Sequence, residues 1–265
     1  MNSAVCKIAI VAALEREVSG LTQGWRSVER EYEGRRFVFF ERDEMVVVCG
    51  GIGMEAARTA AEAAIALYRP PLVQSVGFAG SQDKSLRIGD VFAPAVVIDA
   101  RDGSRVEIDS GNRAGKGKGT LVSFMVVAGI DQKANLAQAY GAHAVDMEAS
   151  AVAAAARAHG IPFDTAKVIS DAYDFEMPAM ASFLDTQGRF RIASFARFVA
   201  LRPWLWPRVA RLAINSRKAA RALGDHLERL RQELSQTSDQ EAGKLATPPE
   251  AHAAVTAESR TGGRE

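Results

Sequence analysis

The chain has 265 residues, of which 48% are hydrophobic, 25% charged and 7% aromatic, and this composition excludes a chain that is disordered throughout. Its 33 basic and 32 acidic side chains leave a formal net charge of +1, so no overall field attracts nucleic acid or an acidic partner. Cys6 and Cys49 lie within apolar runs, which is typical of buried thiols in a reducing compartment. We expect a cytoplasmic protein, because the first residues lack a signal-peptide pattern and no apolar run approaches the roughly 20 residues of a spanning helix.

Segments of strand length alternate with helix-forming segments over residues 1–170. An apolar run at 7–13 predicts a first buried strand, and the hydrophobic runs at 35–40 and 45–49 predict a hairpin. An alanine-rich helix is expected at 54–69, where two prolines end it. The further elements are expected as strands at 72–76, 90–99, 105–109, 120–127, 142–146 and 163–169, and as helices at 131–140 and 148–159.

This alternation predicts an α/β fold, with a mixed and mostly parallel central sheet flanked by helices in a single main domain over residues 1–188. Residues 189–234 are predicted to form C-terminal helices, which Pro203 and Pro207 break. From residue 235 the composition turns polar, with Gly, Pro, Thr and Glu. Residues 235–265 are therefore predicted to be a disordered tail.

Polar residues that follow strands are the candidate site residues, because ligands of open α/β sheets bind beyond the carboxyl ends of the strands. Glu17 follows the first strand, although an acidic residue at a helix start also has a purely structural explanation. Gly51 and Gly53 precede the helix at 54–69, and such a loop either cradles a phosphate with its backbone N–H groups or packs strand tightly against helix. The chain after this loop lacks the acidic residue that a dinucleotide-binding fold needs about 20 positions further on.

Two further strand ends carry the stronger signal. Asp146, Met147 and Glu148 lie at a junction between strand and helix, and Ser170 and Asp171 follow the last buried strand. Glu148 opens a helix that is otherwise almost entirely Ala and Val, so its carboxylate needs partners such as sugar hydroxyls. The remaining candidate, a turn or a stacking face after the strand at 72–76, consists of Gly77, Phe78, Ala79 and Gly80.

The order of these motifs resembles that of the nucleoside phosphorylase and nucleosidase superfamily. The pattern is most similar to methylthioadenosine/S-adenosylhomocysteine nucleosidases. Its continuation at 174–178 and 201–207 is similar to a narrower branch, the hopanoid-associated phosphorylases, which is thought to remove adenine from an adenosylated hopane lipid. The motifs that carry the resemblance are residues 13–18, 50–53, 77–80, 145–149 and 169–171.

The resemblance implies an enzyme that cleaves the N-glycosidic bond of a 5′-modified adenosine and releases adenine. Such cleavage passes through an oxocarbenium-like state, so the leaving base is protonated and a nucleophile is positioned. Asp171 matches the general acid for adenine N7, oriented by Ser170, and partial burial beside Phe175 is expected to keep it protonated. Glu17 matches the base that positions water. The other implied contacts to sugar and base are those of Glu148, Met147, Asp146, Phe78, Ala79, Gly80, Gly51 and Gly53.

Two positions depart from the phosphate-dependent members of the family. Ser75 stands where they have an arginine and Phe78 where they have a serine, so water is favoured as the nucleophile unless the glycine loop and a remote arginine rebuild a phosphate site. A purine nucleoside phosphorylase with phosphate as co-substrate, or a methylthioadenosine/S-adenosylhomocysteine nucleosidase, therefore stays the alternative. A non-catalytic nucleotide-binding module is the second alternative. No other cofactor and no metal is expected, because the four histidines lack ligand spacing. The segment that encloses adenine in the family is short here, at residues 128–133.

The C-terminal segment at 189–221 combines aromatic residues with many arginines and few acids. This pattern predicts an element that contacts an anionic membrane surface, as an enzyme with a lipid-tailed nucleoside substrate would need. The same residues are also explained by packing on the sheet or by a subunit contact, since related enzymes are usually homo-oligomers. The aromatic residues are Phe190, Phe195, Phe198, Trp204 and Trp206.

Overall fold

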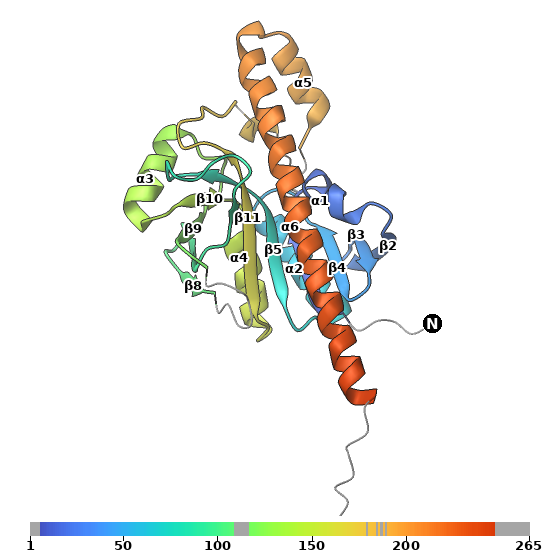
Figure 1. The fold of residues 1–265 in the computed structure, drawn as a ribbon. Helices are drawn as coiled ribbons and strands as arrows, with labels where there is room; N and C mark the ends of the chain where they lie inside the picture. Colours follow the sequence, from blue (N-terminus) through green and yellow to red (C-terminus); the bar gives the residue numbers. More distant parts are fainter. Residues whose placement is uncertain are drawn as a thin grey trace, which may run out of the picture.

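The computed structural model describes residues 6–108, 117–178, 180–183, 185, 188 and 190–246. Its fold is α/β, as predicted, and among the described residues eleven strands form one mixed sheet. The main path through the sheet has the strand order β2-β3-β4-β1-β5-β10-β9-β7-β8, and β11 pairs with β5 and β6. Figure 1 shows this sheet with helices on both of its faces.

The first half of the chain forms a parallel core with an antiparallel hairpin at one edge. β1 pairs in parallel with β4 and with β5, and the predicted hairpin of β3 and β4 is confirmed. A further edge strand, β2, pairs antiparallel with β3, although its charged sequence carries no strand pattern. The elements are β1 (Ile8–Ala12), α1 (Glu15–Thr22), β2 (Arg26–Tyr32), β3 (Arg35–Arg42), β4 (Met45–Cys49), α2 (Met54–Tyr68) and β5 (Val73–Ser81).

The second half adds three parallel strands and a long strand that pairs with β5. β7, β9 and β10 run parallel to one another, and β10 joins the end of β5 in antiparallel pairing. β11 pairs with β5 along the whole of its length. The elements are β6 (Val91–Phe92), β7 (Val96–Asp99), β8 (Arg105–Glu107), β9 (Thr120–Ser123), α3 (Ile130–Tyr140), β10 (Ala144–Asp146), α4 (Ala149–Ala158) and β11 (Phe163–Asp171).

The segment from Gly77 to Gly80 corrects the sequence prediction, because it is the second half of β5 rather than a turn after the strand. Glycines usually interrupt strands, but the ladder to β11 continues through this segment and keeps the backbone extended. Asp171 likewise belongs to the end of β11. The candidate residues of β5 and β11 therefore lie side by side on two paired strands.

The two faces of the sheet are covered by different helices. Alternate residues of β1 point to opposite faces: Ala9 and Val11 pack with the alanines of α2 and α4, and Ile8 and Ile10 pack with α1 and α6. Small alanine side chains let α2 and α4 lie close to the sheet. Figure 1 shows α6 crossing the front of the sheet, with α2 and α4 behind it.

The C-terminal helices are α5 (Ile192–Ala200) and α6 (Trp206–Ala246), with a short 3₁₀ helix, η1 (Ala181–Phe183), before them and another, η2 (Pro203–Leu205), between them. The chain is broken at Pro203 as predicted, but Pro207 lies in the first turn of α6, where a missing N–H costs nothing. α6 also continues past residue 235, where the tail was predicted to begin. Residues 247–265 lie outside the described residues. The same holds for residue 109, the end of the strand predicted at 105–109, and for residue 189, the start of the predicted C-terminal helices.

Candidate active site

A cavity of about 540 Å³, the main cavity, lies where the turn after β1 meets β5, β10 and β11. It is polar on the side of the sheet and apolar on the side of α5 and α6. Gly51 lines an adjoining cavity of about 430 Å³. The predicted site residues that line the main cavity are Glu17, Phe78, Ala79, Gly80, Asp146, Met147, Glu148, Ser170 and Asp171.

Lys167 supplies the positive charge beneath these carboxylates, and sequence reasoning missed it. It lies in β11 with 1% of its surface exposed, and its Nζ is 2.9 Å from Asp146 Oδ2. The same Nζ donates a hydrogen bond to Ser75 Oγ at 3.0 Å. Burial disfavours the ammonium form, but the attraction of Asp146, Glu148 and Glu17 outweighs it, so the pKa of Lys167 is raised. The lysine inside the apolar run at 163–169 was the only signal in the sequence.

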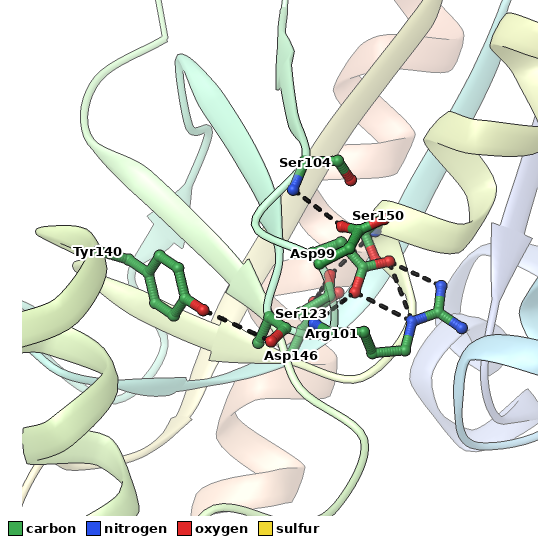
Figure 2. Close-up of polar contacts among 9 residues, drawn as sticks. Asp99, Arg101, Ser104, Ser123, Tyr140, Asp146 and Ser150 are labelled. Atoms are coloured by element: carbon green, nitrogen blue, oxygen red, sulfur yellow. Dashed lines mark hydrogen bonds and ion pairs between the residues drawn. The ribbon is translucent and has the colours of Figure 1, made fainter.

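Asp146 is held by the protein on both of its carboxylate oxygens. Ser123 Oγ donates to Oδ1 at 2.6 Å, and the first backbone N–H of α4 donates to Oδ2 at 2.9 Å, next to the ion pair with Lys167. Ser150 extends the network, because its N–H donates to Ser123 Oγ and its hydroxyl donates to Asp99 (Figure 2). The main task of Asp146 is therefore structural, since both of its oxygens are already engaged by the protein.

Glu148 occupies the anion position that the glycine loop was predicted to offer to a phosphate. The Gly53 N–H, at the start of α2, donates to Glu148 Oε1 at 2.9 Å, and the Met147 N–H donates to Oε2 at 3.2 Å. The Gly51 N–H is bonded to the carbonyl of Ala13 at 3.0 Å. Burial raises the pKa of Glu148 to about 7, against the opposing effect of Lys167. The glycine loop therefore contributes to the site through its hydrogen bond to Glu148.

Glu17 lies in the first turn of α1 and is buried in the cavity wall. Its Oε2 accepts a hydrogen bond from the Leu14 N–H at 3.3 Å. Gly77, at a φ of +140°, makes this position available, since a Cβ at residue 77 would lie 3.0 Å from Glu17 Oε2. Burial raises the pKa of Glu17, and Lys167 opposes the shift. A carboxyl in this state suits the acceptance of a proton from a bound water.

Asp171 has a partner that the sequence did not reveal. Ser170 Oγ donates to Asp171 Oδ1 at 2.8 Å, which is the contact that an orienting role requires. Lys133 Nζ forms a very short ion pair with Asp171 Oδ2 and also donates to the carbonyl of Ala172 at 2.7 Å. The Asp171 carboxyl is thus held by Ser170 on one oxygen and by Lys133 on the other, and its predicted role as general acid stays a prediction.

The apolar wall of the main cavity comes from the chain after β11. Phe190 and Phe195 pack edge to face, with ring centroids 5.2 Å apart, where α5 begins. The side chains of α6 that line the cavity come from its first half, before the helix packs on the sheet. The lining residues of this wall are Met177, Met180, Phe190, Ile192, Phe195, Val209, Leu212, Ala213 and Ala220, with Ser216 and Arg217 beside them.

The outer side of the same helices is apolar and basic. Trp204 is 70% exposed, and large parts of Leu201 and Trp206 are also in contact with solvent. No Asp or Glu occurs between residues 190 and 224, although Glu176 from the preceding segment pairs with Arg208 at 2.6 Å. None of the helices in the described ranges combines the length and the apolar composition needed to cross a membrane. The basic residues of this part of the chain, of which Arg217 also lines the main cavity, are Arg191, Arg197, Arg202, Arg208, Arg211, Arg217, Lys218 and Arg221.

Comparisons with known proteins agree with this fold. The family model described as the phosphorylase superfamily matches residues 7–123 and 120–200. A 5′-methylthioadenosine/S-adenosylhomocysteine nucleosidase of Buchnera aphidicola is 28% identical over 91 residues, which cover 33% of this chain and 39% of that protein.

Two solved structures share the fold at low sequence identity. The 5′-methylthioadenosine/S-adenosylhomocysteine nucleosidase of Colwellia psychrerythraea, in complex with adenine, has a TM-score of 0.55 at 22% identity and covers 63% of this chain and 83% of its own. The futalosine hydrolase of Helicobacter pylori has a TM-score of 0.60 at 20% identity and covers 85% of this chain and 98% of its own.

Proposed function

The chain belongs to the phosphorylase superfamily, and from this premise we propose that it cleaves the N-glycosidic bond of a 5′-modified adenosine and releases adenine. The observation that carries the proposal is the main cavity, in which Asp171 and Ser170 lie on one paired strand while Glu148 and Glu17 line the same space. The curated relative and a solved neighbour are nucleosidases, and that neighbour holds adenine.

Each carboxylate has a task that its surroundings support. Glu148, tethered by two backbone N–H groups, accepts hydrogen bonds from the ribose hydroxyls, and Met147 packs against the sugar. Glu17 positions the attacking water and takes its proton, while Asp171 faces the leaving base. Phe78, Ala79 and Gly80 line the space for base and sugar.

Water is the proposed nucleophile, and the second cavity gives the phosphate-dependent alternative its one specific support. Ser75, at the position of the family's phosphate-binding arginine, is buried and engaged by Lys167. The adjoining cavity is lined by Gly51, Arg16 and Arg35, which is the remote arginine arrangement that a phosphate site would use. The Arg35 guanidinium already donates to the carbonyl of Gly50 at 2.5 Å, so phosphate would have to compete for it.

The 5′ substituent is proposed to be apolar, with adenosylhopane in hopanoid biosynthesis as the leading candidate. The apolar wall of α5 and α6 supports this choice, because it would surround a hydrocarbon group attached beyond the sugar. The exposed basic and aromatic side of these helices supports peripheral contact with an anionic membrane, from which such a substrate would be taken. A contact between two copies of the chain is the alternative use of that surface.

The test is adenine release from methylthioadenosine, adenosylhomocysteine and adenosylhopane, each with and without phosphate. We expect release without phosphate, fastest with adenosylhopane, and a loss of about 100-fold or more in Asp171→Asn, the usual scale for a general acid. Asp174→Asn, which changes an exposed carboxylate three residues later, is the matched control and should keep full activity. Strict dependence on phosphate, with ribose 1-phosphate as product, would establish the phosphorylase instead. Binding of adenine without any turnover would establish the non-catalytic module.

A further inference from the structure

Lys133 is a buried residue in the wall of the main cavity, and neither the sequence motifs nor the proposed roles account for it. It lies near the start of α3 with 2% of its surface exposed. Its Nζ contacts Asp171 Oδ2 and donates to the carbonyl of Ala172 at 2.7 Å. We propose that Lys133 is a positioning residue, which together with Ser170 fixes the Asp171 carboxyl against the leaving base; this inference rests on the proposed function.

The buried side of α3 shows that packing alone does not explain this lysine. Among the described residues of the helix, only Lys133 and Leu136 are buried, and a spacing of three residues places them on the same side. Leu136 packs with apolar side chains that include Ile98 and Val122. An apolar residue would complete such a side, whereas burying the polar end of a lysine costs free energy unless it finds partners. The position of Lys133 is therefore best explained by its contact with Asp171.

Asp171 needs a contact from outside its own strand. The register of β11 against β5 shifts between Ile169 and Asp171, and such a bulge turns a side chain in a new direction. Ser170, which lies in this bulge, donates to Asp171 Oδ1 at 2.8 Å. A single hydrogen bond leaves the carboxyl free to turn about its own side-chain bonds. Because Lys133 holds the other oxygen from a helix elsewhere in the chain, the two contacts together fix the plane of the carboxyl.

Lys133 is itself fixed at both ends. Its backbone N–H donates to the Gly129 carbonyl at 2.9 Å, and its carbonyl accepts a hydrogen bond from Gln82 Nε2 at 3.1 Å, just after β5. At the other end, the bond from Nζ to the Ala172 carbonyl fixes the tip of the side chain. A free lysine side chain samples many rotamers, and these contacts remove that freedom. Lys133 can therefore act as a rigid support.

Gly80 leaves room for this pair of side chains. A Cβ at residue 80 would lie 2.7 Å from Asp171 Oδ2 and 2.9 Å from Lys133 Cε, so any side chain there would push the two groups out of place. Gly80, Lys133 and Asp171 all line the main cavity. The glycine that was predicted to line the base pocket thus has a specific task, which is to admit the contact between Lys133 and Asp171.

The first test is a double-mutant cycle on the release of adenine from adenosine. Lys133→Met keeps the length of the side chain and removes both of its contacts. We expect kcat to fall about 100-fold, the scale for a group misplaced by about 1 Å, while KM changes less than about threefold. In the Asp171→Asn background the same change should cost less than about threefold, because a positioning residue has no task once the group that it positions is disabled. Lys118→Met, at an exposed lysine, is the control and should release adenine at the wild-type rate.

A second leaving group separates positioning from a general disturbance of the site. Adenine needs a proton as it leaves, whereas 4-nitrophenol leaves 4-nitrophenyl β-D-ribofuranoside as a stable anion and needs none. Lys133→Met should therefore release 4-nitrophenol within about threefold of the wild-type rate. A merely structural role of Lys133 would lower the release of both groups alike.

The outcomes separate the inference from the proposed function. An unchanged kcat in Lys133→Met would overturn the positioning role, and so would an equal loss with both leaving groups or the full loss repeated in the Asp171→Asn background. The nucleosidase assignment would stand in each of these cases, because it rests on adenine release by the wild type. If the wild-type chain releases no adenine, the proposed function fails and the inference fails with it.

A second variant keeps the test decisive if Lys133→Met does not fold, as judged by its circular dichroism. Lys133→Gln then takes its place in the cycle. The glutamine side chain is one bond shorter, so it loses at least one of the contacts to Asp171 and Ala172, and the same pattern of losses is expected.

Discussion

The main cavity has two ends that are built in different ways. At the polar end, strand ends hold Asp146, Glu148 and Asp171 in place with backbone N–H groups, serines and buried lysines. At the apolar end, the wall comes from helices outside the sheet, and none of the residues of α5 is buried. The comparison teaches that the sheet holds the polar groups of the cavity in place, while the appended helices supply its apolar wall.

α6 packs on the sheet with one part of its length and lines the apolar wall of the cavity with another. Ala219, Leu223 and Leu227 are fully buried against the sheet and α1. In the preceding turns Leu212 lines the apolar wall, and Ile214 is exposed. Figure 1 shows this first part of α6 extending beyond the sheet beside α5. The buried half anchors the helix, so the outer half can line the cavity without packing on the sheet.

The largest effect is expected at the polar end, from Lys167→Met. This change leaves three buried carboxylates without their shared cation, and breaking a buried ion pair typically costs about 3–5 kcal/mol of unfolding free energy. Urea unfolding at pH 8 would measure the loss, and adenine release should fall with it. The loss should shrink at pH 5.5, because the pKa of Glu148 is raised to about 7 and this carboxylate takes up a proton there. An equal loss at both pH values would contradict the shared-cation role.

Much of the fold was predictable because buried strands carry continuous apolar runs. β1 and the hairpin of β3 and β4 were found in this way. β2 was missed, since Arg26–Tyr32 is an exposed, charged edge strand whose structure comes only from its pairing with β3. The turn expected at Gly77 was wrong, because pairing with β11 outweighs the local preference of glycine.

The site was predictable only in part, for a related reason. Carboxylates that follow strands are visible as motifs, and Glu148 and Asp171 do line one cavity. Their cations are not visible, because Lys133 and Lys167 lie far along the chain from the partners they meet, and a single lysine in a helix or strand does not reveal its contact. The segment at 189–221 was predicted to be helical, aromatic and basic, but only the three-dimensional arrangement makes part of it a cavity wall.

The second prediction concerns Glu148, whose pKa of about 7 links substrate binding to pH. The ionised carboxylate is the stronger acceptor for ribose hydroxyls and the form proposed to bind them, so kcat/KM for adenosine should rise by up to about tenfold per pH unit towards pH 7 and level off above it. The contribution of Glu148 to the free energy of unfolding changes with pH in the opposite direction. Because the folded-state pKa is raised, the contribution of this group to stability is full below its ordinary pKa and is lost as the pH rises through 7.

The control for this pH dependence is Glu148→Gln, which cannot ionise. It should bind substrate poorly at every pH and lose the rise below pH 7, while its unfolding free energy should fall less between pH 5 and pH 8 than that of the wild type. A wild-type profile that is flat from pH 5.5 to 8 would mean that Glu148 does not titrate in this range.

The third prediction tests the apolar end with Leu212→Asn. Placing a polar group in the wall should raise KM for an adenosine with a long apolar 5′ substituent by about tenfold, which corresponds to the loss of one good hydrophobic contact. In the proposed binding mode the 5′ substituent contacts the wall and adenosine itself does not, so the kinetics of adenosine should not change. Ile214→Asn alters an exposed position two residues later and serves as the control. Equal effects on both substrates would indicate a general disturbance of α6 instead of a specific wall.

The smallest effect is expected on the outer side of the same helices, where Trp204 and Trp206 are replaced together by Ala. We expect the wild type to float with vesicles that contain phosphatidylglycerol and not with pure phosphatidylcholine, and the double variant to bind several-fold more weakly. Turnover of adenosine in solution should be unchanged, because neither tryptophan lines the main cavity among the described residues. Leu67→Ala, at an exposed apolar position of α2 behind the sheet, is the control.

The dependence on salt distinguishes the two proposed contacts of this surface, which are an anionic membrane and a second copy of the chain. Attraction between the basic residues and anionic lipid weakens as ionic strength rises, so vesicle binding should fall between low and physiological salt. A dimer that forms through the same tryptophans buries them in protein, and it would persist at high salt and need no lipid. Sedimentation of the wild type and the double variant without vesicles distinguishes the two. Loss of a dimer in the variant, without vesicle binding by the wild type, would assign α5 and the start of α6 to a subunit interface.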